Sequence, residues 1–323
     1  MINPHISGAF FKAIGYLDES KKAVVSVSGG SDSDVVVDFI NQCGFGQKVQ
    51  YVFFDTGLEY DATLSHLDYL EDRYEISIDR VKAYRSIPHC CKTYGVPFIS
   101  KQVSEFIYRL QKHDFDWRDG SYDELIKDYP MCESALKWWT NSHEDVMMNI
   151  SRRKYLKEFL LEYPPNFRVS NKCCAYAKKK TAEKYNLDNN INMVITGIRK
   201  AEGGVRSKAY SSCFSEGKGI SQYRPIFWFT NQDKEEYCKM YSVKHSDCYE
   251  KYGLCRTGCA GCPYGKEYLF ERDVLCKYEP KLYRVTESIF SDAYNHTQKY
   301  MEFRSERERA DAYRNQTTLE GWL

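Results

Sequence analysis

Short apolar runs alternate with longer helical patterns through much of the chain. Residues 34–43 and the stretch that ends at residue 72 carry apolar positions at helical spacing, and each follows a short apolar run and a turn. Strands that alternate with helices are typical of a parallel sheet covered on both faces. The pattern therefore predicts an α/β fold with a parallel, twisted sheet and helices on both faces. Its predicted strands are residues 22–27, 49–54, 75–81 and 193–196.

The middle and the end of the chain have a different composition. Residues 104–165 are rich in Trp, Tyr and charged side chains and carry helical patterns at 134–148 and 152–161, which predicts a helical insertion. From residue 211 onward the chain is rich in Cys, Tyr and Lys. We therefore predict an α/β domain over residues 1–210 and a Cys-rich, mostly helical region over residues 211–323. The helices of this region are predicted at 233–241, 279–293 and 297–313.

Composition narrows the class of protein. The 323 residues include 46 basic and 45 acidic side chains, a net charge of 46 − 45 = +1, which argues against a generally polybasic nucleic-acid binder but allows local basic clusters. The chain shows no leader pattern at its start and no apolar run of about 18 residues, so we expect a cytoplasmic protein without membrane contact. In that reducing environment the 13 cysteines are expected to be metal ligands, reactive thiols or buried apolar residues, not disulfides.

The turn after the first predicted strand is a candidate anion site. Its sequence, SGGSDS, lies between a strand and a helix, where unpaired N–H groups and the helix dipole favour an anion. The glycines let the backbone approach phosphate oxygens, and the serines add hydroxyl donors. A Gly-Lys-Ser/Thr ending is absent, which excludes the ordinary P-loop. The residues of this phosphate loop are Ser28, Gly29, Gly30, Ser31, Asp32 and Ser33.

Five cysteines have the spacing of metal ligands. Cys255, Cys259 and Cys262 form a C-x3-C-x2-C run among glycines, and the adjacent pair Cys173 and Cys174 is the candidate source of a fourth thiolate. Four thiolates suit either an iron–sulfur cluster or structural Zn²⁺. The other eight are interpreted as mostly buried apolar residues, with an activated thiolate at Cys90 or Cys91 as the alternative. These eight are Cys43, Cys90, Cys91, Cys132, Cys213, Cys238, Cys248 and Cys276.

Four segments, in order along residues 20–265, resemble one family. SGGSDS resembles the signature of the PP-loop ATP pyrophosphatases, and VFFDTGLEY at 52–60 is similar to the second-strand segment of their phosphoadenosine phosphosulfate (PAPS) reductase-like branch. NKCC at 171–174, with the lysines at 178–180, resembles the CC-xx-(R/K)K element of that branch. ITGIR at 195–199, continuing to Arg206, is similar to its anion-binding segment.

The resemblance implies an adenine nucleotide alpha hydrolase-like fold that binds ATP and Mg²⁺ at the carboxyl ends of the strands. On this reading the phosphate loop holds phosphate or sulfate oxygens, and Asp32 fixes the loop or a metal ion. Asp55 and Thr56 lie near the nucleotide, and Asp55 is a candidate Mg²⁺ ligand or, alternatively, a carboxylate at a helix N-terminus. Gly197 lets its loop approach the anion, which Arg199 and Arg206 contact; surface arginines are the alternative. The implied catalytic residues are Asp32, Asp55 and Arg199.

The resemblance also extends to the cysteines. They are similar to the [4Fe–4S] ligand set of adenylylsulfate reductases, which would make Cys173, Cys174, Cys259 and Cys262 the ligands. Related DNA-thiolation enzymes would bring in Cys255 in place of Cys173. Zn²⁺ remains the alternative metal.

Two reactions use such an apparatus. Sulfonucleotide reductases of the family carry their attacking thiol near the carboxyl terminus in an ECG(I/L)H motif, which this chain lacks: its last cysteine is Cys276. We therefore predict an ATP-dependent, adenylylating sulfur-transfer enzyme with a [4Fe–4S] cluster, acting in DNA phosphorothioation or in base or tRNA thiolation. Its expected partners are a nucleic-acid acceptor and a cysteine desulfurase or other sulfur donor. The alternatives are a sulfonucleotide reductase that uses thioredoxin and a non-catalytic nucleotide-sensing subunit of a defence or modification system.

Overall fold

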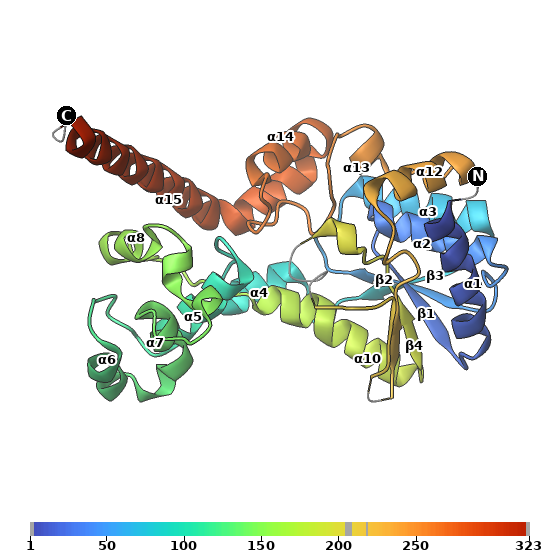
Figure 1. The fold of residues 1–323 in the computed structure, drawn as a ribbon, viewed down its shortest axis with the longest axis horizontal. Helices are drawn as coiled ribbons and strands as arrows, with labels where there is room; N and C mark the ends of the chain where they lie inside the picture. The colour runs from blue at the N-terminus through green and yellow to red at the C-terminus, as the bar shows by residue number, and fades with distance from the viewer. Residues whose placement is uncertain (1–2, 204–208, 218, 321–323) are drawn as a thin grey trace. The chain divides into compact units, whose positions relative to one another are not determined.

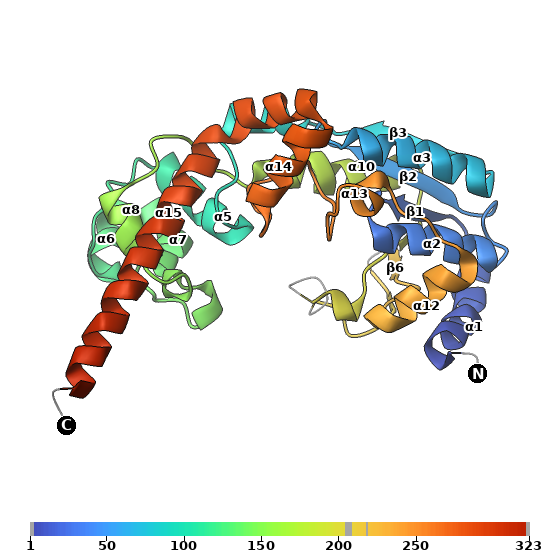
Figure 2. The same cartoon turned by 90° about the horizontal axis from the view of Figure 1, so that it is seen from above.

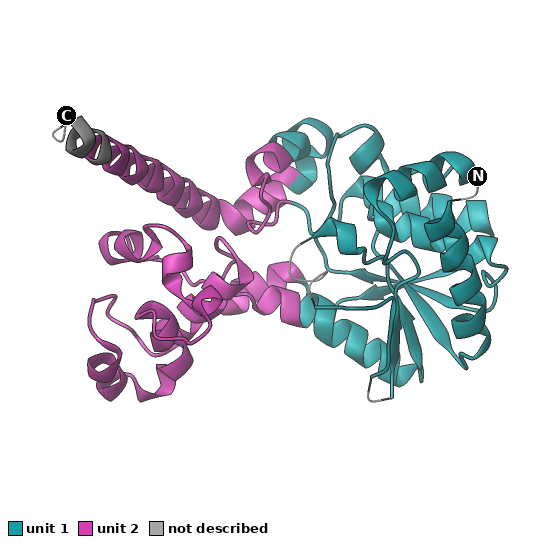
Figure 3. Cartoon of the chain, viewed as in Figure 1, with its two compact units in different colours: residues 1–86, 176–260, 273–282 teal, residues 87–175, 261–272, 283–323 magenta. Residues whose placement is uncertain are grey.

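The computed structural model describes residues 3–203, 209–217 and 219–320, with side chains through residue 314. The chain forms two compact units, coloured separately in Figure 3. Unit 1 comprises residues 1–86, 176–260 and 273–282. Unit 2 comprises residues 87–175, 261–272 and 283–323. Each unit is therefore assembled from segments that are distant in sequence.

Unit 1 is built on a mostly parallel sheet, which confirms the predicted fold class (Figure 1). In the described residues the strand order is β3-β2-β1-β4-β6-β5, and only β5 runs antiparallel to its neighbour. The sheet continues past the predicted boundary at residue 210, because β6 pairs with β4. The strands are β1 Ala23–Val27, β2 Gln50–Asp55, β3 Ile78–Lys82, β4 Met193–Ile195, β5 Phe214–Ser215 and β6 Ser221–Tyr223.

Alternate strand residues face the two sides of the sheet. Val25 and Phe53 belong to the large core under α1, α2, α3 and α12, whereas Val24 and Val52 pack with Tyr185 of α10 on the other side. Figure 2 shows α1 beside α12, where the Asn3 side chain donates a hydrogen bond to Asp233 (2.7 Å). The helices of unit 1 include α1 Pro4–Asp18, α2 Ser31–Gln42, α3 Asp61–Tyr74, α10 Lys180–Asp188, α12 Asn231–Tyr241 and α13 Asp247–Glu250.

Unit 2 is helical around its own core, which includes the buried Trp138 and Trp139. The predicted insertion is helical, but its predicted helix over 134–148 ends at Trp139, and Asn141 adopts a φ of 58°. Pro280–Glu320 is one helix, α15, where two were predicted, because the buried Ala293 and Tyr294 continue its packed face. The structure also describes helices α4 Ile87–Tyr94, α5 Lys101–Lys112, α6 Tyr122–Asp128, α7 Glu133–Trp139, α8 Leu156–Glu162 and α9 Lys172–Cys174 in unit 2, and α14 Tyr268–Tyr278, whose residues are divided between the units. Across the described residues, none of the helices has the length and apolar character that crossing a membrane requires.

Candidate functional site

The phosphate loop connects the end of β1 to the start of α2. Gly29 has a φ of +64°, and a Cβ at this position would lie 2.4 Å from the Thr63 methyl carbon, so the turn requires glycine. The Ser28 N–H donates to the Ser33 hydroxyl (3.0 Å), which ties the loop to the first turn of α2. Gly30, the N-cap of this 12-residue helix, offers no side-chain cap. No side chain at Gly30 therefore caps the positive end of α2, which favours an anion.

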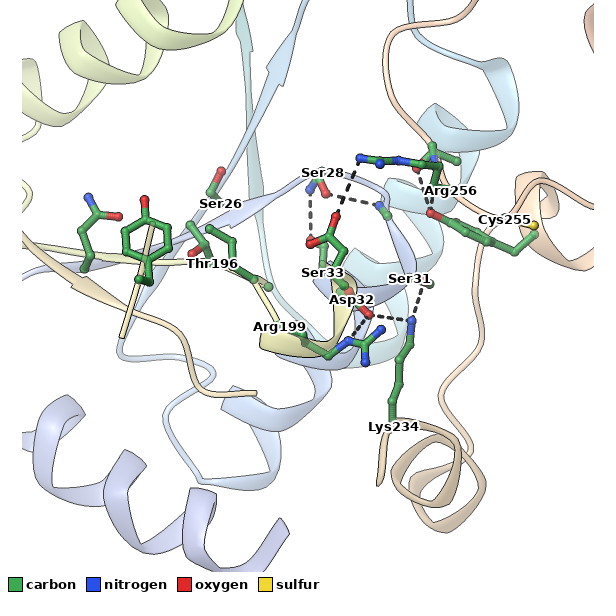
Figure 4. A pocket seen from close by; sticks show the side chains of 18 residues that line it. Ser26, Ser28, Ser31, Asp32, Ser33, Thr196, Arg199, Lys234, Cys255 and Arg256 are labelled. Atoms are coloured by element: carbon green, nitrogen blue, oxygen red, sulfur yellow. Dashed lines mark hydrogen bonds and ion pairs between the residues drawn. The ribbon is translucent and has the colours of Figure 1, made fainter. Parts of the chain in front are cut away.

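A cavity of about 570 Å³ lies over the phosphate loop within unit 1 (Figure 4). This volume falls in the range of small-molecule sites. The loop contributes Ser28, Gly30 and Ser31–Ser33 to the lining. Other lining residues come from the ends of β1 and β4, from α12 and from the segment that follows α13; they include Ser26, Thr196, Gly197, Arg199, Glu202, Tyr210, Lys234, Tyr249, Cys255, Arg256 and Thr257.

In the lining of the cavity, two cationic side chains, Arg199 and Lys234, pair with one carboxylate, Asp32. Asp32 accepts from Arg199 Nε (2.9 Å) and from Lys234 Nζ (2.7 Å), and Lys234 also donates to the Ser31 hydroxyl (2.6 Å). Figure 4 shows Arg199 and Lys234 reaching Asp32 from separate elements. Two positive charges against one negative leave the cluster at 2 − 1 = +1. The cluster suits an anionic ligand because its side chains are largely shielded from solvent.

Arg199 is fixed by more than Asp32. Its Nη1 donates to Asn231 Oδ1 (3.0 Å) and to the Phe229 carbonyl (3.4 Å), and the residue is only 7% exposed. Gly197 lets this segment approach the phosphate loop, since a Cβ there would lie 2.7 Å from the Asp32 carbonyl oxygen. The described contacts of Arg199 therefore position Asp32.

The segment after α13 forms another wall of the cavity. The Tyr249 hydroxyl accepts from the N–H groups of Ser31 and Thr257, the latter at 3.1 Å, and the Thr257 hydroxyl donates to the Gly29 carbonyl (3.5 Å). Burial raises the pKa of Tyr249, so its hydroxyl stays neutral. The Tyr249 hydroxyl oxygen thus already accepts one of the N–H groups in the first turn of α2, that of Ser31. Arg256 at the rim pairs with Glu202 (3.7 Å).

Asp55 and Thr56 lie at the end of β2, beside the strand that carries the phosphate loop. The Asp55 carboxylate accepts the Gly57 N–H (2.8 Å), and the buried Thr56 hydroxyl donates to Glu59 and approaches Cys259 Sγ (3.8 Å). Burial raises the pKa of Glu59 and of the Cys259 thiol. Neither Asp55 nor Thr56 belongs to the described lining of the cavity.

The structure brings most of the predicted anion-site residues together. Gly29 supports the loop without lining the cavity, and Arg206 lies outside the described residues. Sequence reasoning missed Lys234, Tyr249 and Thr257. The predicted helix at 233–241 carried a signal for Lys234, but a lysine in a charged helix is usually solvated. The predicted residues in the cavity lining are Ser28, Gly30, Ser31, Asp32, Ser33, Gly197 and Arg199.

The predicted metal-binding cysteines are divided between the units. Cys255 and Cys259 belong to unit 1, and Cys173, Cys174 and Cys262 belong to unit 2. Within the described parts of the chain, no three His, Cys, Asp or Glu side chains are arranged to hold a metal ion.

The surroundings of Cys173 are rich in thiols. The Cys173 thiol is hydrogen-bonded to Cys174 and to Cys91. The bond to Cys174 lowers the pKa of Cys173, whereas the bond to Cys91 and burial raise it, and the net result is a raised pKa. Cys91, interpreted from sequence as one of the buried apolar cysteines, is thus a direct neighbour of Cys173 on α4. Sulfur donors of this kind fit an iron–sulfur cluster or Zn²⁺ and do not fit a hard cation such as Mg²⁺.

The mostly parallel sheet and its phosphate loop define an α/β protein of the PP-loop nucleotide-binding class. The phosphoadenosine phosphosulfate reductase domain family matches residues 22–264, and the chain belongs to this family.

Three known proteins illustrate the similarity. An uncharacterized protein of Methanocaldococcus jannaschii is 33% identical over 148 residues, 44% of this chain but only 26% of that protein's own length. An uncharacterized 37.8 kDa protein of Escherichia phage 186 is 26% identical over 274 residues, 83% of this chain and 75% of the relative. The phosphate complex of PAPS reductase from Candida auris has a TM-score of 0.44 at 13% identity, covering 80% of this chain and 96% of that one.

Proposed function

We propose that the chain binds ATP in the cavity of unit 1 and transfers its adenylyl group to an acceptor, which then takes up sulfur. The observation that carries this proposal is the net-positive cluster of Asp32, Arg199 and Lys234 at the N-terminus of α2. The 570 Å³ cavity above the cluster has the size of a small-molecule site. Helix N-terminus, cations and volume together suit a polyphosphate.

The described contacts suggest how a triphosphate would bind. Its oxygens would accept from the first N–H groups of α2, where the Tyr249 hydroxyl now accepts from Ser31. The Lys234 ammonium, which contacts Asp32 and Ser31, would turn from them toward the β and γ phosphates. It would thereby supply the cation that the lysine of an ordinary P-loop supplies. Arg199 would stay in place and hold Asp32.

The proposed reaction begins with displacement at the α phosphorus. An acceptor oxygen forms a bond to this phosphorus and loses its proton to solvent, while the bond to the β phosphate breaks and pyrophosphate leaves with the electron pair. The loop N–H groups would stabilise the charge that develops on the α phosphate. A hydrosulfide ion from the sulfur donor then attacks the acceptor carbon that carries this oxygen, forming a C–S bond as the C–O bond breaks and AMP leaves with the electron pair. Mg²⁺ would neutralise the pyrophosphate, and Asp55 is the candidate carboxylate ligand for it.

A metal centre is also part of the proposal. The cysteines that would hold it are those with ligand spacing, and their thiols fit an iron–sulfur cluster, with Zn²⁺ as the alternative. A cluster would relay sulfur or electrons to the reaction, whereas Zn²⁺ would only stabilise the fold. The residues concerned are Cys173, Cys174, Cys255, Cys259 and Cys262.

One observation favours a second candidate, reduction of a sulfonucleotide. Cys255 is exposed and lines the same cavity as the phosphate loop. Its thiolate would attack the sulfur of a bound sulfonucleotide, forming an S–S bond as the S–O bond breaks and the nucleotide leaves. The dithiol of thioredoxin would then reduce this S-sulfocysteine and release sulfite, becoming oxidised to its disulfide. In this reaction Cys255 takes the place of the C-terminal cysteine that the chain lacks.

The two candidates are separated by assaying wild-type protein and Cys255→Ser, purified without oxygen. Adenylylation predicts that ATP with DNA, tRNA or small acceptors yields pyrophosphate. Cys255→Ser should retain this release, because it precedes any transfer of sulfur or electrons from the metal centre. Reduction predicts sulfite from adenylylsulfate and thioredoxin, abolished in Cys255→Ser. Sulfite release by the wild type and not by Cys255→Ser would overturn our choice in favour of reduction. Tight ATP binding without either product would favour a nucleotide-sensing subunit.

A further inference from the structure

We infer that a surface formed by Tyr84, Arg85, Tyr176 and Lys180 binds an unstacked base of single-stranded nucleic acid. This aromatic–basic surface would present the acceptor to the nucleotide site of unit 1. The inference rests on the proposed function and names the class of acceptor for it.

The surface combines stacked rings with cations. Tyr84 is 56% exposed, and its ring lies 6.4 Å from that of Tyr176 with an angle of 23° between the planes. The Arg85 guanidinium lies over both rings, 5.9 Å from the centroid of Tyr84 and 5.1 Å from that of Tyr176. The Lys180 ammonium lies 4.5 Å from the Tyr176 centroid. Aromatic faces with nearby cations are the usual means of binding single strands without sequence preference.

Further charge surrounds these rings. Lys82, at the end of β3, and Lys178 and Lys179 before α10 are exposed. The acidic side chains among their described contacts are Glu59, near Lys178, and Glu183, 4.0 Å from Lys179. These lysines add positive charge beside the rings, which suits a phosphate backbone although the chain as a whole is almost neutral.

Hydrogen bonds fix the surface at the edge of the sheet that carries the site. The N–H of Ala83 donates to the Asp55 carbonyl (2.8 Å), at the carboxyl end of β2. The next residue, Tyr84, donates its N–H to the Thr181 hydroxyl (2.9 Å), which in turn donates to the Tyr176 carbonyl (3.0 Å). Because β1, β2 and β3 are parallel, their carboxyl ends share one edge. An acceptor held at Tyr84 would thus lie on the edge that also bears the phosphate loop.

Single strands fit this surface better than a duplex. A base can stack on the exposed face of Tyr84 only after it leaves its own stack, and loops and single strands provide such bases at least cost. The lysines would contact the phosphates on either side of that base.

The test is binding of fluorescein-labelled DNA and RNA single strands of about 12 nucleotides, measured by anisotropy without ATP. We expect Tyr84→Ala to weaken binding by about tenfold or more, because base–aromatic stacking is lost, and Tyr84→Phe to bind like the wild type. Phe11→Ala, which removes a 78% exposed aromatic of α1, is the matched control and should change nothing. Thermal unfolding of each variant verifies that it is folded.

Several outcomes would overturn the inference: equal affinity of wild type and Tyr84→Ala, equal loss in Phe11→Ala, or a duplex bound as tightly as the single strands. Pyrophosphate release with a small acceptor but no strand binding would reject the surface and leave the proposed function standing. Tyr84-dependent strand binding without any release of pyrophosphate would reject the proposed function and leave the surface standing.

Discussion

At the scale of single residues, Lys234 links the phosphate loop to α12. Its ammonium contacts two oxygens of the loop, Asp32 Oδ1 at 2.7 Å and Ser31 Oγ at 2.6 Å. Our account assigns these two contacts to the state without bound ATP. From the sequence, Lys234 and Lys239 belong to the same charged helix, and nothing there indicates which of them contacts the loop. The difference arises in the tertiary structure, since Lys239 is exposed and pairs with Glu235 on its own helix.

This difference supplies the first prediction. Lys234→Met should weaken ATP binding by about ten- to a hundredfold, because a charge-assisted hydrogen bond to a phosphate is lost. Adenosine binding should not change, since adenosine has no phosphates. Isothermal titration with both ligands measures this, and Lys239→Met is the control. A parallel loss of ATP and adenosine affinity would mean that Lys234 serves the fold and not the phosphates.

Gly197 supplies a second prediction at this scale. The Cβ of Gly197→Ala would lie 2.7 Å from the Asp32 carbonyl oxygen, so the two loops must separate. Overpacking of this kind costs about 1–3 kcal/mol. We expect a lower free energy of unfolding in urea together with weaker ATP binding. Gly8→Ala is the control, because a Cβ there meets nothing within 4 Å in α1. Wild-type behaviour of Gly197→Ala would show that the close approach is not required.

At the scale of elements, the sequence predicted those whose patterns are long. Strands β1, β2 and β3 and helix α2 were predicted within about three residues, because apolar runs bounded by glycine or polar residues are strong signals. Strands β5 and β6 were missed because Phe-Ser and Ser-Gln-Tyr form no apolar run, whereas the similarly short β4 is Met-Val-Ile. Helix α15 was predicted as two helices with Tyr294, Asn295 and His296 between them, whereas in the structure the buried Tyr294 belongs to the packed face of one continuous helix.

His296 on α15 gives this scale its prediction. Its ring lies 5.0 Å from Phe98 and 4.9 Å from Phe159, and burial, followed by repulsion from Lys299, lowers its pKa to about 4. The unfolded state, with a pKa near 6.5, therefore binds a proton that the folded state rejects, and stability falls as the pH drops from 6.5 toward 4. After allowance for partial solvent screening, the loss by pH 5 is about 1–2 kcal/mol. Urea unfolding at pH 7 and pH 5 should show a smaller difference for His296→Phe, and an unchanged difference would contradict this assignment.

At the scale of the whole molecule, sequence and structure contribute different parts of the candidate site. The loop SGGSDS could be predicted because its residues are contiguous. The cavity walls could not, because residues 196–199, 234 and 249–257 meet the loop only through the order of the strands and the segment after α13. The cysteine spacing predicted metal ligands but gave no sign of Cys91. That residue lies beside Cys173 because α4 packs against α9 in the tertiary structure.

The metal centre is testable at this scale. Anaerobically purified wild-type protein should contain iron and acid-labile sulfide and absorb broadly near about 400 nm, as cysteine-bound clusters do. Cys262→Ser should lose this absorbance and the iron, whereas Cys276→Ser, which changes an exposed cysteine, should keep both. A colourless protein that contains zinc would contradict the cluster and support structural Zn²⁺ in its place.

The central claim is that the cavity over the phosphate loop cleaves ATP between its α and β phosphates. The most direct measurement follows ATP labelled at the α phosphate, with single-stranded nucleic acid as acceptor, in wild-type protein and in Lys234→Met and Lys239→Met. Our account predicts acceptor-dependent pyrophosphate and, in equal amount, label transferred to the acceptor with the wild type and Lys239→Met, and a marked loss of both in Lys234→Met. Addition of the sulfur donor should then release this label as AMP. Release of ADP and orthophosphate, or equal activity of Lys234→Met and the wild type, would contradict it.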